Sequence, residues 1–435
     1  MRGTRHTQSM IGWQTCRIPF VAVLSSGLFA LSACSGGGSS DSTSPSVSKI
    51  VVQPMTNVMP STHGGYFSDP YPIQQTKASA SSTFPAFSGT TRQTLTCPGN
   101  LQPGCFAATA NALDLSRVAP QAAAHGASIT GFENLNIFQD SMGAWHMAVT
   151  VEINNPSAPQ GKTDWHVIMH AHPTSTAAGI PTAWTADSVL AGSLSGWAAG
   201  NYDGKYVEDA GTLYLVYSMN LADTYNGIAA QAMQSATTPA SSAPVPLLGP
   251  ETGNGAYNSE LFYGLGQSNQ YRQIETGNVT KIQGKYVMTY SVGGYNQPDY
   301  KAGIAWSDTF LPTSGGTYQR VQKMDTAGVW GQPNHAEVQY LLQSQEAQWP
   351  NYVADQVLSP GVPSIVSDTS GRYFLVFAGY APSDAPTQSG LYIGSYRRPF
   401  YVGLDVNIPA GAVVGKTSPQ DLASWIQPAT TPSNP

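Results

Sequence analysis

The chain has 435 residues, of which 10% are charged, and it contains 44 Gly, 22 Tyr and 9 Trp. This length and aromatic content exclude a disordered chain and allow a large buried core. The formal net charge is −6, and the few Lys and Arg residues are scattered, so the chain offers no basic face for nucleic acid.

The first 34 residues predict export. Arg2, Arg5 and Arg17 precede an apolar run at residues 18–31, which is too short to span a membrane as a stable helix. We interpret residues 1–33 as a signal peptide. The run ends in Leu31-Ser-Ala-Cys34, which resembles the bacterial lipobox, whose Cys becomes the lipidated first residue of the mature protein. The alternative is an ordinary secretory signal with an incidental Cys.

Residues 34–49 are rich in Gly and Ser and are predicted to form a flexible tether. Residue 35 is Ser rather than Asp, so the familiar inner-membrane retention cue is absent. We therefore expect a lipid-anchored protein of the bacterial cell envelope, attached to the outer membrane and either periplasmic or surface-exposed. If Cys34 carries the lipid, Cys34→Ala releases the protein from membrane fractions.

The remaining cysteines predict a disulfide. Cys16 leaves with the signal peptide, so Cys97 and Cys105 are the two thiols of the folded part, and they flank the turn-rich loop PGNLQPG. In an oxidising compartment two such thiols favour a loop-closing disulfide. A metal pair is disfavoured because no third and fourth ligands follow at finger spacing.

From about residue 50 onward, the pattern indicates short strands and turns. Only residues 107–124 have a helix-like composition. Four hairpins share one phrase, in which an aliphatic strand, a turn built on Gly and an aromatic strand follow each other at residues 137–149, 206–217, 279–290 and 365–377. Third strands at residues 164–170 and 301–306 favour propeller blades. A large β-sandwich is the alternative, because repeated hairpins also arise there by chance.

A fifth unit precedes these four. Residues 69–73 and 83–88 supply its inner strands, followed by an insertion with the two Cys residues and the helix. We predict an all-β, five-bladed β-propeller over residues 50–410, with Arg397 to Val406 closing the last blade on the first. Residues 411–435 are predicted to be a C-terminal tail, and the protein is expected to be a monomer.

The stretches Gln273-Ile-Glu275, 286–291 and 300–308 resemble the acid-bearing blade of glycoside hydrolase family 43, the arabinanase, arabinofuranosidase and β-xylosidase group. The resemblance covers roughly residues 66–406 and implies a five-bladed propeller that hydrolyses arabinose- or xylose-containing glycans with inversion. It also implies roles for three carboxylates. Glu275 would be the general acid, Asp69 the general base, and Asp203 the residue that orients the acid and raises its pKa.

Each of the three acids also has a structural interpretation. Glu275 could cap a turn at the rim, and Asp69 could start a turn because Pro70 follows it. Asp203 could belong to an Asp-Gly turn, since Gly204 stands where the family usually has Pro.

Two stretches depart from the family pattern. Glu133-Asn-Leu-Asn136 stands where many members have Ala-Pro-Asp, and Gly361-Val-Pro-Ser364 stands where many have Gly-His-Asn-Ser. That His often helps to hold a central calcium-type ion, and neither Val362 nor Pro363 can ligate one, so we expect no cofactor or metal. His335 is the remaining candidate ligand for such an ion. Four further histidines are interpreted as strand residues: His146, His166, His170 and His172.

Aromatic residues are predicted to form the wall of a sugar pocket, because flat sugar faces stack on such rings. We select Trp197, Tyr202 and Trp330 for this wall, and we interpret Arg272 as a surface charge. The expected partner is a polysaccharide or oligosaccharide. The alternatives are a non-catalytic propeller that binds glycan or serves as an envelope scaffold, and a furanosidase of the fructan-cleaving group. A sialidase is disfavoured because its arginine cluster is missing from the sequence.

Overall fold

The structure is a computed structural model that describes residues 49–55, 67–75, 86–89, 92–98, 101, 104–154, 164–175, 179–191, 200–222, 225–250, 260–263, 270–312, 316–324, 336–345, 347 and 351–430. All of these residues belong to the unit formed by Ser48–Pro435. Cys34 and nearly all of the expected tether lie outside the described residues, so the lipid anchor stays a prediction. Within the described ranges, no helix has the length and apolar character needed to cross a membrane.

The strands of the described residues pair into five antiparallel sets, which we number in chain order. Set 1 contains β2 (Tyr71–Pro72), β4 (Phe87–Ser88), β5 (Gln93–Thr96) and β6 (Ala107–Ala110). Set 2 contains β8 (Ser128–Gln139), β9 (Trp145–Asn154), β10 (Asp164–Pro173) and β11 (Ala183–Ala191), with β3 (Gln74–Gln75) and β7 (Ala112–Asp114) in parallel pairing at its edges.

Sets 3 and 4 share one sheet, because β14 and β18 pair in parallel over two residues. Set 3 contains β12 (Asn201–Asp209), β13 (Thr212–Ala222), β14 (Tyr225–Ser235), β15 (Thr238–Pro239) and β16 (Val245–Leu248). Set 4 contains β17 (Leu261–Tyr263), β18 (Gln270–Ile282), β19 (Lys285–Val292), β20 (Lys301–Ser307) and β21 (Gln319–Arg320).

Set 5 joins the two ends of the described chain. It contains β24 (Leu358–Ser367), β25 (Tyr373–Tyr380), β28 (Arg398–Val406), β29 (Ile426–Pro428) and, from the N-terminal side, β1 (Gln53–Pro54), which pairs with β28. Two short hairpins lie outside the sets, β22 (Gln322–Met324) with β23 (Ala336–Val338) and β26 (Thr387–Gln388) with β27 (Leu391–Tyr392). The helical pieces are α1 (Ala119–Ala124) and the 3₁₀ turns at Pro382–Asp384, Gly394–Tyr396, Val414–Lys416 and Asp421–Ser424.

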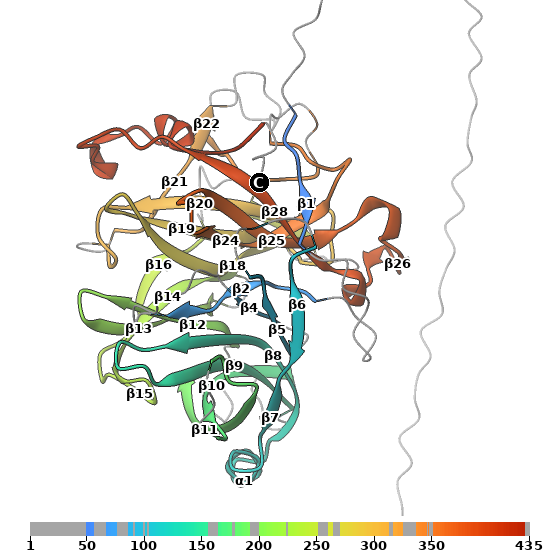
Figure 1. The fold of residues 1–435 in the computed structure, drawn as a ribbon, viewed down its shortest axis with the longest axis vertical. Coiled ribbons are helices and arrows are strands. Elements are labelled where there is room, and N and C mark those ends of the chain that lie inside the picture. Colours follow the sequence, from blue (N-terminus) through green and yellow to red (C-terminus); the bar gives the residue numbers. More distant parts are fainter. Residues whose placement is uncertain are drawn as a thin grey trace, which may run out of the picture. The chain divides into compact units, whose positions relative to one another are not determined.

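The innermost strands of the five sets close a ring. Strand β2 contacts β8, β8 contacts β12, β12 contacts β18, β18 contacts β24, and β24 contacts β2 (Figure 1). A sandwich of two sheets cannot produce this cycle, so the sandwich alternative is wrong. The arrangement is the predicted all-β propeller, and five sets is the number that five blades require.

The repeated hairpins of the sequence form as expected. They are β8–β9, β12–β13, β18–β19 and β24–β25, and their turns contain Gly143, Gly211, Gly284 and Gly371. All four glycines have positive φ, between 78° and 93°, a backbone region that residues with a Cβ rarely adopt. The glycines therefore fix where each inner strand ends and its neighbour begins.

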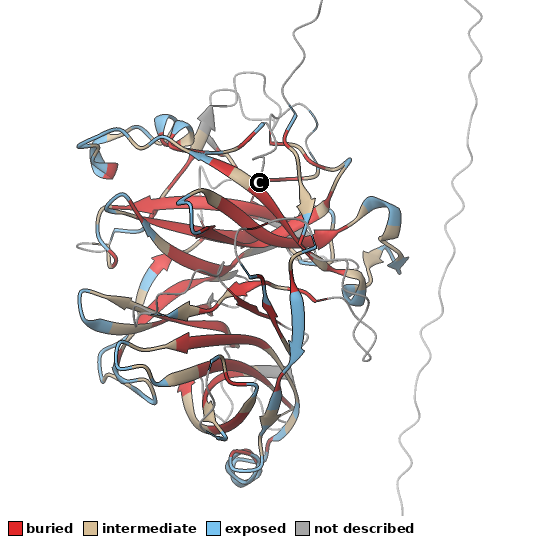
Figure 2. Ribbon diagram, in the orientation of Figure 1, coloured by how far each residue is buried: buried red, intermediate tan, exposed pale blue. Residues whose placement is uncertain are grey.

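Apolar side chains fill the spaces between neighbouring sets. The cluster around Leu215 joins sets 2 and 3, and the cluster around Met288 joins sets 3 and 4. The cluster around Phe377 joins sets 4 and 5, and the cluster around Phe374 joins sets 5 and 1. In Figure 2 most buried residues follow the strands, and the exposed residues follow the turns, α1 and the strand β6. This packing holds the ring of inner strands together and positions their side chains.

Three details correct or extend the predictions. Only Ala119–Ala124 of the helix-like stretch is helical, and its first part forms β6 and β7. Cys97 and Cys105 form the expected disulfide, but it closes the β5–β6 connection inside set 1 and does not lie in an insertion. Part of the predicted C-terminal tail packs on set 5, where Leu422 and Trp425 are buried and β29 pairs with β28.

Candidate active site

A pocket of about 490 Å³ lies among the innermost strands, and each set contributes one residue with unusual backbone geometry to it. These five residues have positive φ although none is glycine: Asp69 (55°), Asn134 (53°), Asp203 (58°), Thr276 (58°) and Val362 (52°). The last four lie in β-bulges, where the register of the inner strand shifts. Such strain is stored mainly at functional sites, where a bulge re-aims side chains.

The bulges of sets 3 and 4 explain two glycines. A Cβ on Gly204 would lie 2.6 Å from Ile168 Cγ2, and one on Gly277 would lie 2.7 Å from Ile228 Cδ1. Glycine at these positions lets the inner strand pack closely on the neighbouring set. Gly204, which departs from the family pattern, is therefore required by packing against β10, and Asp203 lies in a bulge of β12 rather than in an Asp-Gly turn.

Asp203 is buried at the floor of the pocket, with 2% of its surface exposed. Tyr71 donates a hydrogen bond from its hydroxyl to Oδ1 over 3.0 Å, and the Asn134 side-chain amide donates to the same oxygen. Burial raises the pKa of Asp203; Lys205 opposes the shift, and the Glu275 and Asp69 carboxyl groups add to it. A carboxyl group from set 3 is thus held by side chains from sets 1 and 2.

Glu275 is also buried, and its side chain accepts hydrogen bonds at both oxygens. Tyr300 donates to Oε1 over 2.6 Å, Tyr202 donates to Oε2 over 2.9 Å, and the Gln273 amide donates to Oε2 as well. Burial raises the pKa of Glu275, and these three hydrogen bonds oppose the shift without cancelling it. Burial, and not the expected neighbour Asp203, is therefore the largest cause of the raised pKa of Glu275.

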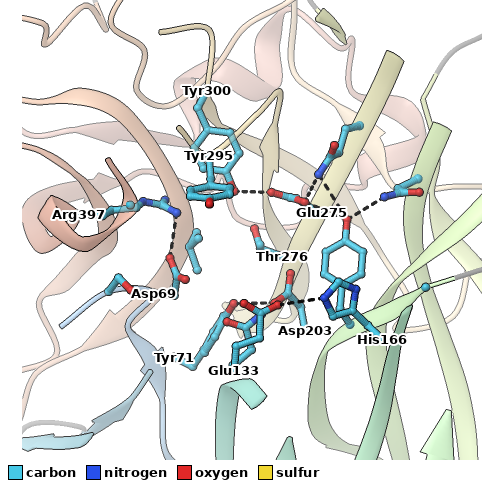
Figure 3. A pocket seen from close by; sticks show the side chains of 18 residues that line it. Asp69, Tyr71, Glu133, His166, Asp203, Glu275, Thr276, Tyr295, Tyr300 and Arg397 are labelled. Carbon is cyan, nitrogen blue, oxygen red and sulfur yellow. Dashed lines mark hydrogen bonds and ion pairs between the residues drawn. The ribbon is translucent and has the colours of Figure 1, made fainter. Parts of the chain in front are cut away.

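Asp69 faces the pocket from the chain just before β2. Its Oδ1 lies 3.0 Å from Nη1 of Arg397, whose side chain is buried immediately before β28. The Arg397 guanidinium also lies over the rings of Tyr300 and Tyr295 (Figure 3). A guanidinium can bind a carboxylate through two N–H groups, so Arg397 holds Asp69 in one orientation.

Glu133 is a fourth carboxyl group in the pocket. It precedes Asn134 in the bulge of β8, and its nearest charged partner is His166 on β10, with 3.8 Å between Oε1 and Nε2 (Figure 3). Burial, followed by the charges of Asp203 and Asp69, raises the pKa of Glu133 to about 8. From the sequence, Glu133 stands out only as a departure from the family pattern and not as a pocket residue.

The structure brings together the three predicted acids and one of the three predicted wall residues, Tyr202. Trp197 and Trp330 lie outside the described residues, and the side chain of Arg272 is not described. Sequence reasoning missed Arg397, Glu133, Tyr71 and Tyr300 as pocket residues. The only available signal was the position of Glu133 in the second blade, where the resemblance places a family motif.

Three of the histidines on β9 and β10 form a hydrogen-bonded network among residues that do not line the pocket, whereas His166 on β10 lines it. His170 and His172 contact the two oxygens of Asp187 over 2.7 and 2.6 Å, and His146 lies 3.1 Å from His170 and 3.3 Å from Asp140. They are strand residues, as expected, but carboxylates do accompany them. No group of three or more acidic, His or Cys side chains in the described ranges is arranged to hold a metal, and His335 lies outside those ranges.

Comparison with known proteins agrees with the fold. No protein-family model and no curated protein matches the sequence. Among solved structures, a thermostable family-43 glycoside hydrolase aligns with a TM-score of 0.51 and 17% identity over 88% of this chain and 97% of that chain. An α-L-arabinofuranosidase from Lactobacillus brevis aligns with a TM-score of 0.55 and 14% identity over 78% of this chain and 91% of that chain. The chain has the propeller fold of family-43 glycoside hydrolases. At these identities the likeness concerns the fold alone.

Proposed function

We propose that this protein is a glycoside hydrolase that cleaves arabinose- or xylose-containing glycans with inversion of configuration. One observation carries the proposal: three carboxyl groups from three strand sets, Asp69, Asp203 and Glu275, line one pocket. Two carboxyl groups on opposite faces of a sugar ring are what glycoside hydrolysis requires. Similarity in fold to a family-43 glycoside hydrolase and to an arabinofuranosidase supports the choice of reaction and sugar.

Glu275 is the proposed general acid. A buried carboxyl group with a raised pKa keeps its proton at higher pH than an exposed one and can deliver it to the leaving glycosidic oxygen. Tyr202, Tyr300 and Gln273 fix the rotamer of Glu275. They also stabilise the carboxylate that remains after the proton has left.

Asp69 is the proposed general base. Its carboxylate, held by Arg397, accepts a proton from a water molecule as that water attacks the anomeric carbon. Inversion needs room for this water, and in inverting enzymes roughly 6.5–9.5 Å separates acid and base. Placement of Asp69 in set 1 and Glu275 in set 4, across the ring of inner strands, suits such an arrangement.

Asp203 is proposed as a positioning residue. Its side chain bonds Tyr71 and Asn134, and its backbone N–H donates to Thr150 Oγ1 over 3.0 Å, so it links three sets beneath the sugar. Tyr295, 48% exposed at the pocket, provides an aromatic face on which a sugar ring can stack. It adds an aromatic ring to the wall predicted from Trp197, Tyr202 and Trp330.

The test is a kinetic comparison of wild type and Glu275→Gln on aryl α-L-arabinofuranosides, aryl β-D-xylosides and arabinan. The amide keeps the size of the side chain but has no acidic proton to transfer to the leaving oxygen, so kcat should fall by roughly 10²–10⁴. Glu208→Gln, at the far end of β12, is the control and should keep the wild-type rate. The anomer released first, followed by NMR, should be the inverted one.

Two results contradict the proposal. One is a Glu275→Gln variant that keeps the full rate on a substrate with a poor leaving group. The other is a wild type that hydrolyses none of these substrates but binds glycan, which supports the alternative of a non-catalytic binding propeller.

A further inference from the structure

Glu133 occupies the same backbone position as the proposed acid, in a different set. Glu133 directly precedes the positive-φ residue Asn134 in the bulge of β8, and Glu275 directly precedes the positive-φ residue Thr276 in the bulge of β18. Both side chains line the pocket. The three-acid chemistry uses Glu275 and leaves Glu133 without a role.

The Glu133 carboxyl group is available to a ligand. It is 29% exposed, and it accepts no hydrogen bond from any residue in the described part of the chain; its ion-pair partner there is His166, at 3.8 Å. Figure 3 shows Glu133 beside Asp203 and directed into the pocket. A partly buried carboxyl group without hydrogen bonds is costly to keep unless something binds it.

We propose that Glu133 is a specificity-determining residue that binds a hydroxyl group of a neutral sugar in this pocket and selects against sugars that carry a carboxylate. This inference rests on the proposed glycosidase function and names the class of sugar that the site takes. A uronic acid would place its carboxylate beside the carboxyl groups of Glu133, Asp203 and Glu275, where each of these groups that ionises repels it. The buried guanidinium that lines the pocket, that of Arg397, is already paired with Asp69.

The protonation state of Glu133 supports a donor role. Its pKa is raised to about 8, first by burial and then by neighbouring carboxyl groups, so at neutral pH the group is protonated and can donate to a sugar oxygen. Above this pH it ionises, loses the donor and repels anions. The charged groups that act on it or line its pocket are Asp69, Glu152, His166, Asp203, Glu275 and Arg397. The titratable hydroxyl groups of the lining belong to Tyr71, Tyr202, Tyr295 and Tyr300.

The experiment compares wild type with Glu133→Ala, Glu133→Gln and the control Glu208→Gln, at the far end of β12, which does not line the pocket. Loss of one hydrogen bond is worth roughly 1 kcal/mol, so Glu133→Ala should raise KM for aryl arabinofuranoside or xyloside by about 5- to 10-fold at pH 7. Its kcat should stay within about threefold of wild type. Glu133→Gln retains N–H donors, so its KM at pH 7 should remain near the wild-type value.

The pH dependence separates a binding role from a structural one. In wild type KM should rise as the pH passes about 8, and in Glu133→Gln this rise should disappear. The proposal is overturned if Glu133→Ala leaves KM unchanged while its melting temperature shows it to be folded, or if kcat falls as far as in Glu275→Gln. If the alanine variant does not fold, the pH profile of Glu133→Gln decides alone.

Direct sugar binding separates failure of this inference from failure of the proposed function. If wild type hydrolyses no aryl glycoside, the hydrolase proposal fails, and calorimetric titration with arabinobiose, xylobiose and glucuronic acid still tests Glu133. Binding of a neutral disaccharide that weakens about 5- to 10-fold in Glu133→Ala supports the inference. Tighter binding of glucuronic acid than of both disaccharides, or no binding of either disaccharide, overturns it.

Discussion

The bulges of β8 and β18 place a glutamate in the same pocket by the same backbone device, yet they create two different chemical groups. In both bulges the glutamate precedes a non-glycine residue with positive φ. Glu275 accepts hydrogen bonds from Tyr202, Tyr300 and Gln273, whereas Glu133 accepts none from a described residue and lies 3.8 Å from His166.

This difference shows that the repeat of the fold sets where a side chain points, and the neighbouring sets decide what it can do. The donors to Glu275 come from β12, from the β19–β20 connection and from β18 itself. A carboxyl group fixed at both oxygens is suited to one proton transfer in a defined direction. A carboxyl group without such donors is suited to bind whatever hydroxyl group the ligand presents.

The largest expected effect is a loss of kcat, and its dependence on the leaving group distinguishes the proposed acid from the proposed base. Asp69→Asn should lower kcat by roughly 10²–10⁴, as Glu275→Gln does, because the amide cannot accept a proton from water. The two variants should differ in their response to the leaving group. A dinitrophenyl glycoside needs no proton on its leaving oxygen, so it should restore much of the activity of Glu275→Gln and little of that of Asp69→Asn.

Leaving-group dependence is measured as kcat on dinitrophenyl and nitrophenyl glycosides of the same sugar. Asp140→Asn, in the β8–β9 turn away from the pocket, is the matched control for Asp69→Asn and should follow wild type on both. If Asp69→Asn recovers on the better leaving group and Glu275→Gln does not, the assignment of acid and base must be exchanged. Equal recovery of both variants would contradict the role of Asp69 as the base.

An intermediate effect is expected when Glu275 is made more like Glu133 by removing one donor. The Tyr300 hydrogen bond lowers the pKa of Glu275 against the larger effect of burial, so Tyr300→Phe should raise that pKa. The basic limb of the kcat/KM profile, where the acid loses its proton, should then move to higher pH by up to about one unit. Because the acid is also less well oriented, kcat at the optimum should fall about tenfold.

The control for this variant is Tyr318→Phe. Tyr318 is also fully buried and donates one hydrogen bond, to the Phe310 carbonyl over 2.9 Å, but it does not line the pocket. It should lower stability without moving the pH profile. A basic limb that stays in place or moves to lower pH in Tyr300→Phe would show that the Tyr300 hydrogen bond does not act on the acid.

The sequence predicts the repeat of the fold because that repeat is local. Gly143, Gly211, Gly284 and Gly371 mark turns that need positive φ, and the alternating apolar runs around them mark the strands, so four hairpins can be read directly. The pairing of β1 with β28 is not local, and only the need to close a ring of blades suggested it. The short β6 and β7 were missed because their alanines favour helix over strand when neighbouring strands are ignored.

The candidate site was predictable only in part, for a related reason. Asp69, Asp203 and Glu275 could be selected because each lies in a short motif that resembles a known family. Arg397 carries no such signal, since its importance comes from contact with Asp69, more than 300 residues earlier in the chain. Positive φ at Asn134 and Val362 has no local signature either, because neither residue type demands that conformation.

The smallest expected effect concerns stability and tests whether Glu133 is held in an unfavourable environment. The pKa of Glu133 is raised from 4.5 to about 8 in the folded protein. Between these values the folded state retains a proton that the unfolded state has lost, so the free energy of unfolding should fall as the pH rises. In Glu133→Gln this titrating carboxyl group is absent, so its contribution to the pH dependence of stability disappears. Relative to wild type this variant should gain roughly 1–2 kcal/mol between pH 5 and pH 8, an amount reduced by the partial exposure of the side chain.

Urea unfolding at pH 5, 6, 7 and 8 measures this gain, and Glu208→Gln again serves as the control. The stability of Glu275→Gln is measured over the same pH range for comparison. The charged form of Glu275 is stabilised by three donors, whereas Glu133 accepts no hydrogen bond from a described residue, so Glu275→Gln should gain less stability over the same pH range than Glu133→Gln. Stability curves of wild type and Glu133→Gln that run parallel from pH 5 to pH 8 would show that Glu133 ionises as readily as an exposed glutamate. Its role as a neutral hydrogen-bond donor at pH 7 would then be lost, although a role as an acceptor for sugar hydroxyls would not depend on it.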